Sequence, residues 1–121
     1  MTTYVVLLPG DEDLWEAATP EHRAGVYDKH AEFSKALADR GHKVVGGAEL
    51  AHSKAAKQVR KDAAGGVVVT DGPYAETVEQ LTGFYLIESD DLEDLLDACS
   101  IVADVESSVE VREMLTKGGG A

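Results

Sequence analysis

Residues 83–103 carry the clearest structural signal in the chain, and they read GFYLIESDDLEDLLDACSIVA. The segment Gly83–Glu88 is short, apolar and aromatic, which is typical of a β-strand. After it, apolar side chains recur three and four positions apart, which predicts an amphipathic helix. The residues of this apolar stripe are Leu92, Leu95, Leu96, Cys99, Val102 and Ala103. A strand that leads directly into a helix indicates a βαβ-type fold rather than an all-α or all-β one.

Both predicted helices have recognisable ends. Ser89-Asp90-Asp91 opens the helix above, and Asp90 stands three residues before Glu93, as in a capping box. An earlier helix begins at Thr19-Pro20, where Thr19 caps and Pro20 suits the first helical position. It runs to about Arg40 and stops at Gly41, and Val26, Phe33 and Leu37 share its apolar face.

The order of elements predicts the fold class. Beside Gly83–Glu88, five further short segments have strand-like composition, and a glycine pair marks a bulge in one of them. They are Tyr4–Leu8, Lys43–Leu50 with Gly46-Gly47, the hairpin arms Ala56–Lys61 and Gly66–Asp71, and Ser108–Met114. With the hairpin set aside, the order is strand, helix, strand, twice over. We therefore expect an α+β, ferredoxin-like fold: an antiparallel sheet with two helices on one face and an inserted hairpin.

Length and charge limit the organisation and the partners. The 121 residues suit one domain, expected over residues 1–117, with a flexible tail at 118–121. The formal net charge of −12 argues against nucleic acid and against anionic membrane surfaces as partners. The uncovered face of the expected sheet favours a homodimer, through that face or through strand edges.

Cysteine content and hydropathy indicate in which cellular compartment the protein is expected. Cys99 is the only cysteine, so the chain forms no internal disulfide, and its place on a core stripe predicts an inert buried thiol. The longest apolar runs are too short to span a bilayer. These observations predict a cytoplasmic protein.

His30 is the residue whose chemistry stands out. It lies between Val26 and Phe33 on the apolar stripe of the first helix, where the pattern calls for a hydrophobic side chain. A histidine at such a position can act as a general acid or base, with its protonation set by burial and by a carboxylate partner. The same position also suits a structural histidine whose hydrogen bonds are satisfied in the core.

The segment Asp71-Gly72-Pro73 closes the second hairpin arm. Asp71 is a candidate carboxylate partner for a histidine, while Gly72 and Pro73 are also what a simple turn requires. Tyr74, Glu76 and Thr77 follow, and we expect them either to line a ligand pocket or to form the loop before the next strand. No metal site is expected, because the remaining histidines are dispersed, and no cofactor motif is present.

The stretch Val68-Val69-Thr70-Asp71-Gly72-Pro73-Tyr74-Ala75-Glu76-Thr77 closely resembles the signature of the YCII-related, DGPF-motif family. The family usually has phenylalanine at the position of Tyr74. Residues 79–88 and 108–112 are also similar to the family. His52, Ser53 and Glu113 depart from it, since each stands where the family often has proline.

The resemblance implies a dimeric, ferredoxin-like fold of the α/β-barrel type. It also implies a His–Asp pair in a pocket, here His30 with Asp71, and ligand contacts from Gly72, Pro73, Tyr74 and Glu76. Two functions remain open. One is a small-molecule enzyme that uses this pair for acid/base chemistry, and the other is a non-catalytic homodimer that binds a ligand or another protein.

Overall fold

The computed structural model describes residues 1–115, which form a four-stranded antiparallel sheet, two long helices and a separate hairpin. In chain order the elements are β1 (Thr2–Asp11), α1 (Glu12–Glu16), α2 (Pro20–Asp39), β2 (Lys43–Glu49), the 3-10 turn η1 (Ser53–Ala55), β3 (Lys57–Lys61), β4 (Val67–Asp71), β5 (Glu79–Ser89), α3 (Leu92–Ala103) and β6 (Glu110–Glu113). The expected tail, residues 118–121, lies outside this described part.

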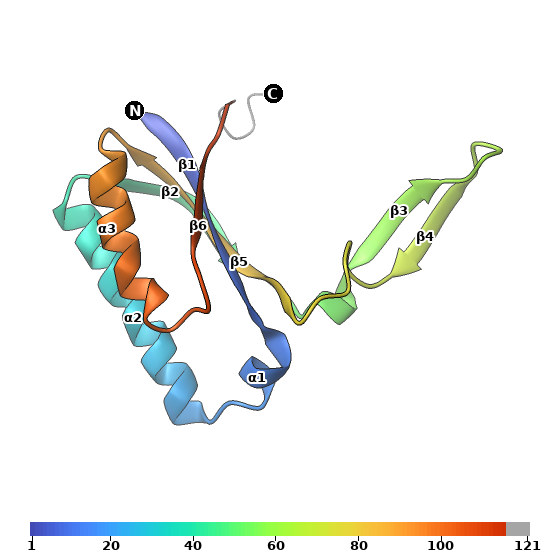
Figure 1. Ribbon diagram of the computed structural model, residues 1–121, viewed down its shortest axis with the longest axis horizontal. Helices are drawn as coiled ribbons and strands as arrows, with labels where there is room; N and C mark the ends of the chain where they lie inside the picture. The colour runs from blue at the N-terminus through green and yellow to red at the C-terminus, as the bar shows by residue number, and fades with distance from the viewer. Residues whose placement is uncertain (116–121) are drawn as a thin grey trace.

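The main sheet has the strand order β2-β5-β1-β6, and every neighbouring pair is antiparallel. Helix α2 links β1 to β2, and α3 links β5 to β6, so the chain forms two βαβ units. Both helices lie on the same side of the sheet (Figure 1). This arrangement confirms the ferredoxin-like α+β prediction.

The helix ends confirm one expected cap and correct another. The Thr19 hydroxyl accepts a hydrogen bond from the backbone N–H of His22 at 3.1 Å, so Thr19 caps α2 as predicted. At α3 the cap is Asp91, which accepts from the N–H of Asp94, and not Asp90. The helix begins one residue later than expected because the Ser89 hydroxyl accepts the Asp91 N–H and holds the chain extended there.

The core lies between the helices and the sheet. Its largest fully buried side chains come from β1, α2, β5 and α3: Val6, Phe33, Leu37, Ile87, Leu95 and Val102. The stripe predicted on α3 is too wide, because Leu92 and Leu96 are 41% and 48% exposed while Ala98 is buried. The face of α3 that contacts α2 and the sheet is therefore centred on Leu95, Ala98, Cys99 and Val102.

The glycine pair in β2 confirms the predicted bulge. The register of β2 against β5 shifts between Val44 and Gly46. Gly47 has φ +145°, and a Cβ atom there would lie 2.5 Å from the carbonyl oxygen of Phe84. Only glycine allows the two backbones to approach this closely.

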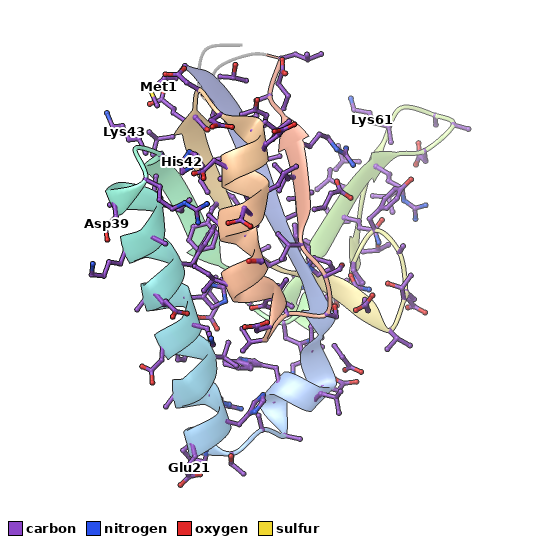
Figure 2. All side chains as sticks on the ribbon, turned by 60° about the vertical axis from the view of Figure 1, so that its left-hand side comes forward. Met1, Glu21, Asp39, His42, Lys43 and Lys61 are labelled. Carbon is purple, nitrogen blue, oxygen red and sulfur yellow. The ribbon has the colours of Figure 1, made fainter. Side chains whose placement is uncertain are left out.

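Strands β3 and β4 form the predicted hairpin, which we call the arm (residues 57–71). Its turn is Asp62–Gly65, where the N–H of Gly65 donates to the carbonyl of Asp62 and Gly65 has φ +84°. The arm is a two-stranded sheet of its own and projects on the side of the main sheet opposite to α2 and α3 (Figure 1). Lys61 lies near its tip (Figure 2).

Candidate functional site

A cavity of about 1360 Å³ opens between α2, α1 and the helix-facing side of the sheet. Leu8, Val26, His30, Tyr85 and Glu106 line it, together with side chains of α1 and β2. The cavity lies beyond the end of the packed core, because α3 stops at Ala103 and leaves the first half of α2 uncovered.

His30 is held between two polar partners in the wall of this cavity. Its Nδ1 lies 2.6 Å from the Tyr85 hydroxyl, and its Nε2 lies 2.7 Å from Oε1 of Glu106. The side chains of His30 and Glu106 are 17% and 14% exposed, so the pair is largely shielded from water. An ionised carboxylate can only accept, so Nε2 carries a proton and, in the neutral ring, Nδ1 accepts from Tyr85. The three residues form one continuous hydrogen-bonded chain, which we call the His30 relay.

The sequence folds locally so as to bring these three groups together. The apolar neighbours of His30 on α2, Val26 and Phe33, are both buried, so the histidine ring also points at the sheet. Tyr85 pairs with Val6 and packs edge-on against Phe33, which places its hydroxyl on the helix side of β5. Glu106 lies in the turn that follows α3, and its backbone N–H donates to the carbonyl of Val102.

Electrostatics keep the relay tyrosine protonated. Burial, and secondly the nearby Glu106 carboxylate, raise the pKa of Tyr85 above its ordinary value of 10.0. At neutral pH the phenol therefore retains its proton and can donate it. A protonated phenol next to a histidine and a carboxylate can pass a proton along the chain in either direction.

The rim of the cavity is acidic and aromatic. The hydroxyl of Tyr27 donates to the carboxylate of Glu49 at 3.1 Å, and the ring of Trp15 stands edge-on to Tyr27 at 5.6 Å. Burial, followed by this hydrogen bond, raises the pKa of Tyr27. The guanidinium of Arg23 lies over Trp15 and donates to its carbonyl oxygen, so it is tied to the rim.

Within one chain the structure gives Asp71 and His30 different partners and does not bring the expected pair together. Asp71 ends β4 in the arm, is 78% exposed, and pairs with Lys57 on the neighbouring strand. Both ring nitrogens of His30 are meanwhile occupied by Tyr85 and Glu106. The two are separated because β4 pairs with β3 instead of joining the main sheet. A catalytic role for each residue stays a prediction.

The four predicted ligand contacts do not line the large cavity. Gly72, with φ +104°, and Pro73 form the turn at the base of the arm, where the Gln58 side chain donates to the Pro73 carbonyl at 2.6 Å. Tyr74 is 96% exposed and borders a small groove with Leu7 on the opposite side of the sheet. Glu76 is exposed in the following loop. This part of the segment has the geometry of a turn.

Sequence reasoning missed Tyr85 as a site residue and missed Glu106 altogether. Strand alternation could have placed Tyr85 on the helix side, because neighbouring strand residues such as Phe84 and Tyr85 face opposite ways. No periodicity marks Glu106, because it lies in the irregular turn after α3. His52 lines the cavity, and the N–H of the adjacent Ser53 donates to the buried carboxylate of Glu12, a lining residue, at 2.7 Å.

One group in residues 1–115, Asp13, Glu16 and His52, brings three potential metal-ligand atoms within 4.8 Å of one another. Its hydrogen bonds do not suit a metal. Nδ1 of His52 accepts the N–H of Lys54, so in the neutral ring Nε2 carries the proton and faces Asp13 at 3.1 Å. The ammonium of Lys54 lies 3.4 Å from Glu16 and neutralises that carboxylate. The Nε2 proton of His52 and the ammonium of Lys54 therefore already occupy the positions next to these carboxylates that a metal ion would take.

A second histidine cluster, Ser89, His42 and Asp94, has the composition of a hydrolytic triad but not its accessibility. His42 Nδ1 lies 2.8 Å from the Ser89 hydroxyl, and Nε2 lies 2.7 Å from Asp94. Ser89 is only 1% exposed, so no substrate can reach its oxygen. His42 lies at the opposite end of α2 from Glu21 (Figure 2), where the cluster ties α2, β5 and α3 together.

The fold and the cavity define a small antiparallel α+β domain with a polar site between its helices and its sheet. A family model described as the YCII-related domain matches residues 2–117. A relative from Rhizobium meliloti (strain 1021), described as uncharacterized protein R00369, is 34% identical over 114 residues, which cover 92% of this chain and 90% of the relative. The chain therefore belongs to the YCII-related family.

Proposed function

We propose that this protein is a small-molecule enzyme that moves a proton through the His30 relay. The observation that supports the proposal is the chain of hydrogen bonds Tyr85–His30–Glu106 in the wall of a large cavity. Both histidine nitrogens are occupied, so a ligand meets the chain at its ends, Tyr85 or the second carboxylate oxygen of Glu106, and both residues line the cavity. In this proposal Tyr85 is the group that contacts the substrate, and His30 acts through it.

The relay can act as a base with its proton count balanced. A ligand gives a proton to the Tyr85 oxygen while the phenolic proton moves to Nδ1 of His30. The Nε2 proton stays shared with Glu106, whose negative charge stabilises the imidazolium that has formed. The reverse transfer returns the proton to another atom of the ligand, which completes an isomerisation, or to a leaving group as its bond to the ligand breaks, which completes an elimination.

Charge around the cavity favours a neutral or cationic substrate. The lining contains one arginine, Arg23, and six carboxylates: Asp11, Glu12, Glu16, Glu49, Glu79 and Glu106. A cavity lined mainly by one sign of charge attracts ligands of the opposite sign and repels those of the same sign. The aromatic rim of Trp15 and Tyr27 adds faces suited to an organic cation.

A second candidate function is non-catalytic ligand binding by a homodimer. The observation in its favour is that both nitrogens of His30 are already satisfied, which a purely structural histidine also requires. In that case the relay stiffens the wall of a binding cavity. The ligand would leave the protein chemically unchanged.

The test is a thermal-shift screen of neutral, cationic and anionic small molecules, followed by incubation of each binder with the protein in D₂O. We expect binders among the neutral and cationic compounds, and mass spectrometry should show deuterium entering the bound compound or a new product. Tyr85→Phe and His30→Gln should still bind the compound but exchange it at least a hundredfold more slowly. The matched control is Asp28→Asn, an exposed carboxylate of α2 outside the cavity lining, which should behave as wild type. Binders that neither react nor exchange would favour the non-catalytic function.

We also propose that two copies associate through the side of the main sheet opposite to the helices. On this side β1 and β5 present Val5, Leu7, Phe84 and Leu86, whose side chains alternate with those of the core. A half-covered apolar sheet face is commonly buried by a second copy. Sedimentation at micromolar concentration should give twice the monomer mass, and a monomer would contradict it.

A cytoplasmic location completes the proposal. It rests on the presence of one cysteine, Cys99, in the sequence. In residues 1–115 no helix has the length and apolar character that crossing a bilayer requires.

A further inference from the structure

Nothing within residues 1–115 covers the arm. Its two strands pair only with each other, and both of its outer edges are open. Val59, Val67 and Val69 share one face of the hairpin, since Val59 pairs with Val69, and they are 69%, 65% and 59% exposed. A two-stranded hairpin by itself is at best marginally stable in water. The arm therefore needs a partner to cover its valine face.

The arm also differs in charge from the rest of the protein. The arm, residues 57–71, holds three of the 11 basic side chains and two of the 23 acidic ones, so it carries +1 while the remainder carries −13. The basic residues of the arm are Lys57, Arg60 and Lys61. A basic, apolar arm is complementary to an acidic protein body.

The position of the arm indicates which partner fits. It extends on the side of the main sheet opposite to α2 and α3, which is the side that carries the apolar sheet face (Figure 1). A molecule seated on that sheet face therefore meets the arm as well. A second copy of this chain supplies the acidic surface that the arm complements, and two-fold symmetry lets each arm contact the other body. Nucleic acid is disfavoured because the body behind the arm is strongly negative.

We propose that the arm clasps a second copy of this chain, burying its valine face and placing its basic strand β3 against the partner's acidic body. This inference rests on the homodimer proposed above and identifies the arm as an element that holds the two copies together. Two bodies of charge −13 repel each other, and the two basic arms offset that repulsion at the interface. The dimer should consequently weaken when salt screens the attraction.

Sedimentation of the full chain between 1 and 100 μM tests the clasp. We expect wild type to be dimeric and the double variant Val59→Thr/Val69→Thr to have a dissociation constant at least tenfold higher, since threonine keeps the β-branched shape but is polar. The control is Val68→Thr, the same change on the opposite face of β4, which should dissociate as wild type. Raising NaCl from 50 to 500 mM should also weaken the wild-type dimer, and Lys57→Gln/Lys61→Gln, on the valine face of β3, should reduce that salt dependence.

Hydrogen–deuterium exchange keeps the inference falsifiable if the double variant folds poorly. Amides of residues 57–71 in wild type should be protected in the dimer and lose protection on dilution well below the dissociation constant that sedimentation gives, and added DNA should not restore it. A dimer whose dissociation constant is unchanged in the valine variant would overturn the clasp and leave the dimer standing. An arm that exchanges equally fast in dimer and monomer would do the same, whereas a wild-type monomer at 100 μM would overturn both the clasp and its basis.

Discussion

The Nε2 atom of His30 lies 2.7 Å from Oε1 of Glu106, a residue 76 positions later in the chain. The contact joins the middle of α2 to the turn after α3, and the Tyr85 hydroxyl holds the other ring nitrogen at 2.6 Å. A histidine fixed on both sides has one ring orientation and one preferred neutral tautomer, which are the conditions for directed proton transfer.

Glu106→Gln tests the importance of that contact. The amide keeps the size of the side chain and an acceptor oxygen, so the fold should hold and the thermal midpoint should change little. The imidazolium loses its stabilising charge, and turnover or deuterium exchange of a bound compound should fall by about 10²- to 10⁴-fold. Enzyme kinetics beside a melting curve separate the two effects. Unchanged turnover in a folded Glu106→Gln protein would remove the relay from the mechanism.

Acid stability should depend on Asp94. Hydrogen bonds from Arg40 and, secondly, from His42 lower the pKa of Asp94 below its ordinary value of 3.8. Because the folded-state pKa is depressed, the ionised carboxylate stabilises the fold fully above the unfolded value and loses this effect as pH falls through the folded value. Urea midpoints of wild type and Asp94→Asn should therefore differ at pH 7 and converge below pH 3.8. A difference that persists at pH 2 would mean that the charge is not the cause.

The bulge in β2 should tolerate no side chain at Gly47. An alanine there would need φ +145° and would bring its Cβ to 2.5 Å from the carbonyl oxygen of Phe84. Gly47→Ala should lower the free energy of unfolding by roughly 1–3 kcal/mol, or more if β2 detaches. Gly25→Ala is the matched control, because Gly25 is helical and nothing lies within 4 Å of the added Cβ. It should stabilise the protein by about 1 kcal/mol in urea unfolding.

The thiol of Cys99 should be unreactive in the native protein. Burial raises its pKa from 9.0 to about 11, so its thiolate fraction at pH 8 is about a hundredfold lower than in an exposed cysteine. Alkylation by iodoacetamide at pH 8 should be at least that much slower than in urea, where the core is open. Equal rates in both conditions would show that α3 detaches readily from the core.

Local patterns predicted most of the fold. Thr19-Pro20 and Gly41 mark the ends of α2, and the Gly46-Gly47 pair marks the bulge, because caps and glycine conformations depend on neighbouring residues alone. The order of strand and helix segments predicted the two βαβ units, because each segment can be recognised from its own local pattern. The exposed positions Leu92 and Leu96 were misjudged because helical spacing shows that a face is apolar but not how much of it a neighbouring element covers.

The site depended on the fold as a whole. The sequence by itself determined that His30 occupies an apolar face, which singled out the residue, and that Asp71-Gly72-Pro73 forms a turn. Only the tertiary structure decided that the partners of His30 are Tyr85 and Glu106, 55 and 76 residues away, because their meeting depends on strand order and on where α3 ends. It likewise placed Asp71 on the arm, because β4 pairs with β3 and is not part of the main sheet. Contacts of this range result from packing, and no local pattern encodes them.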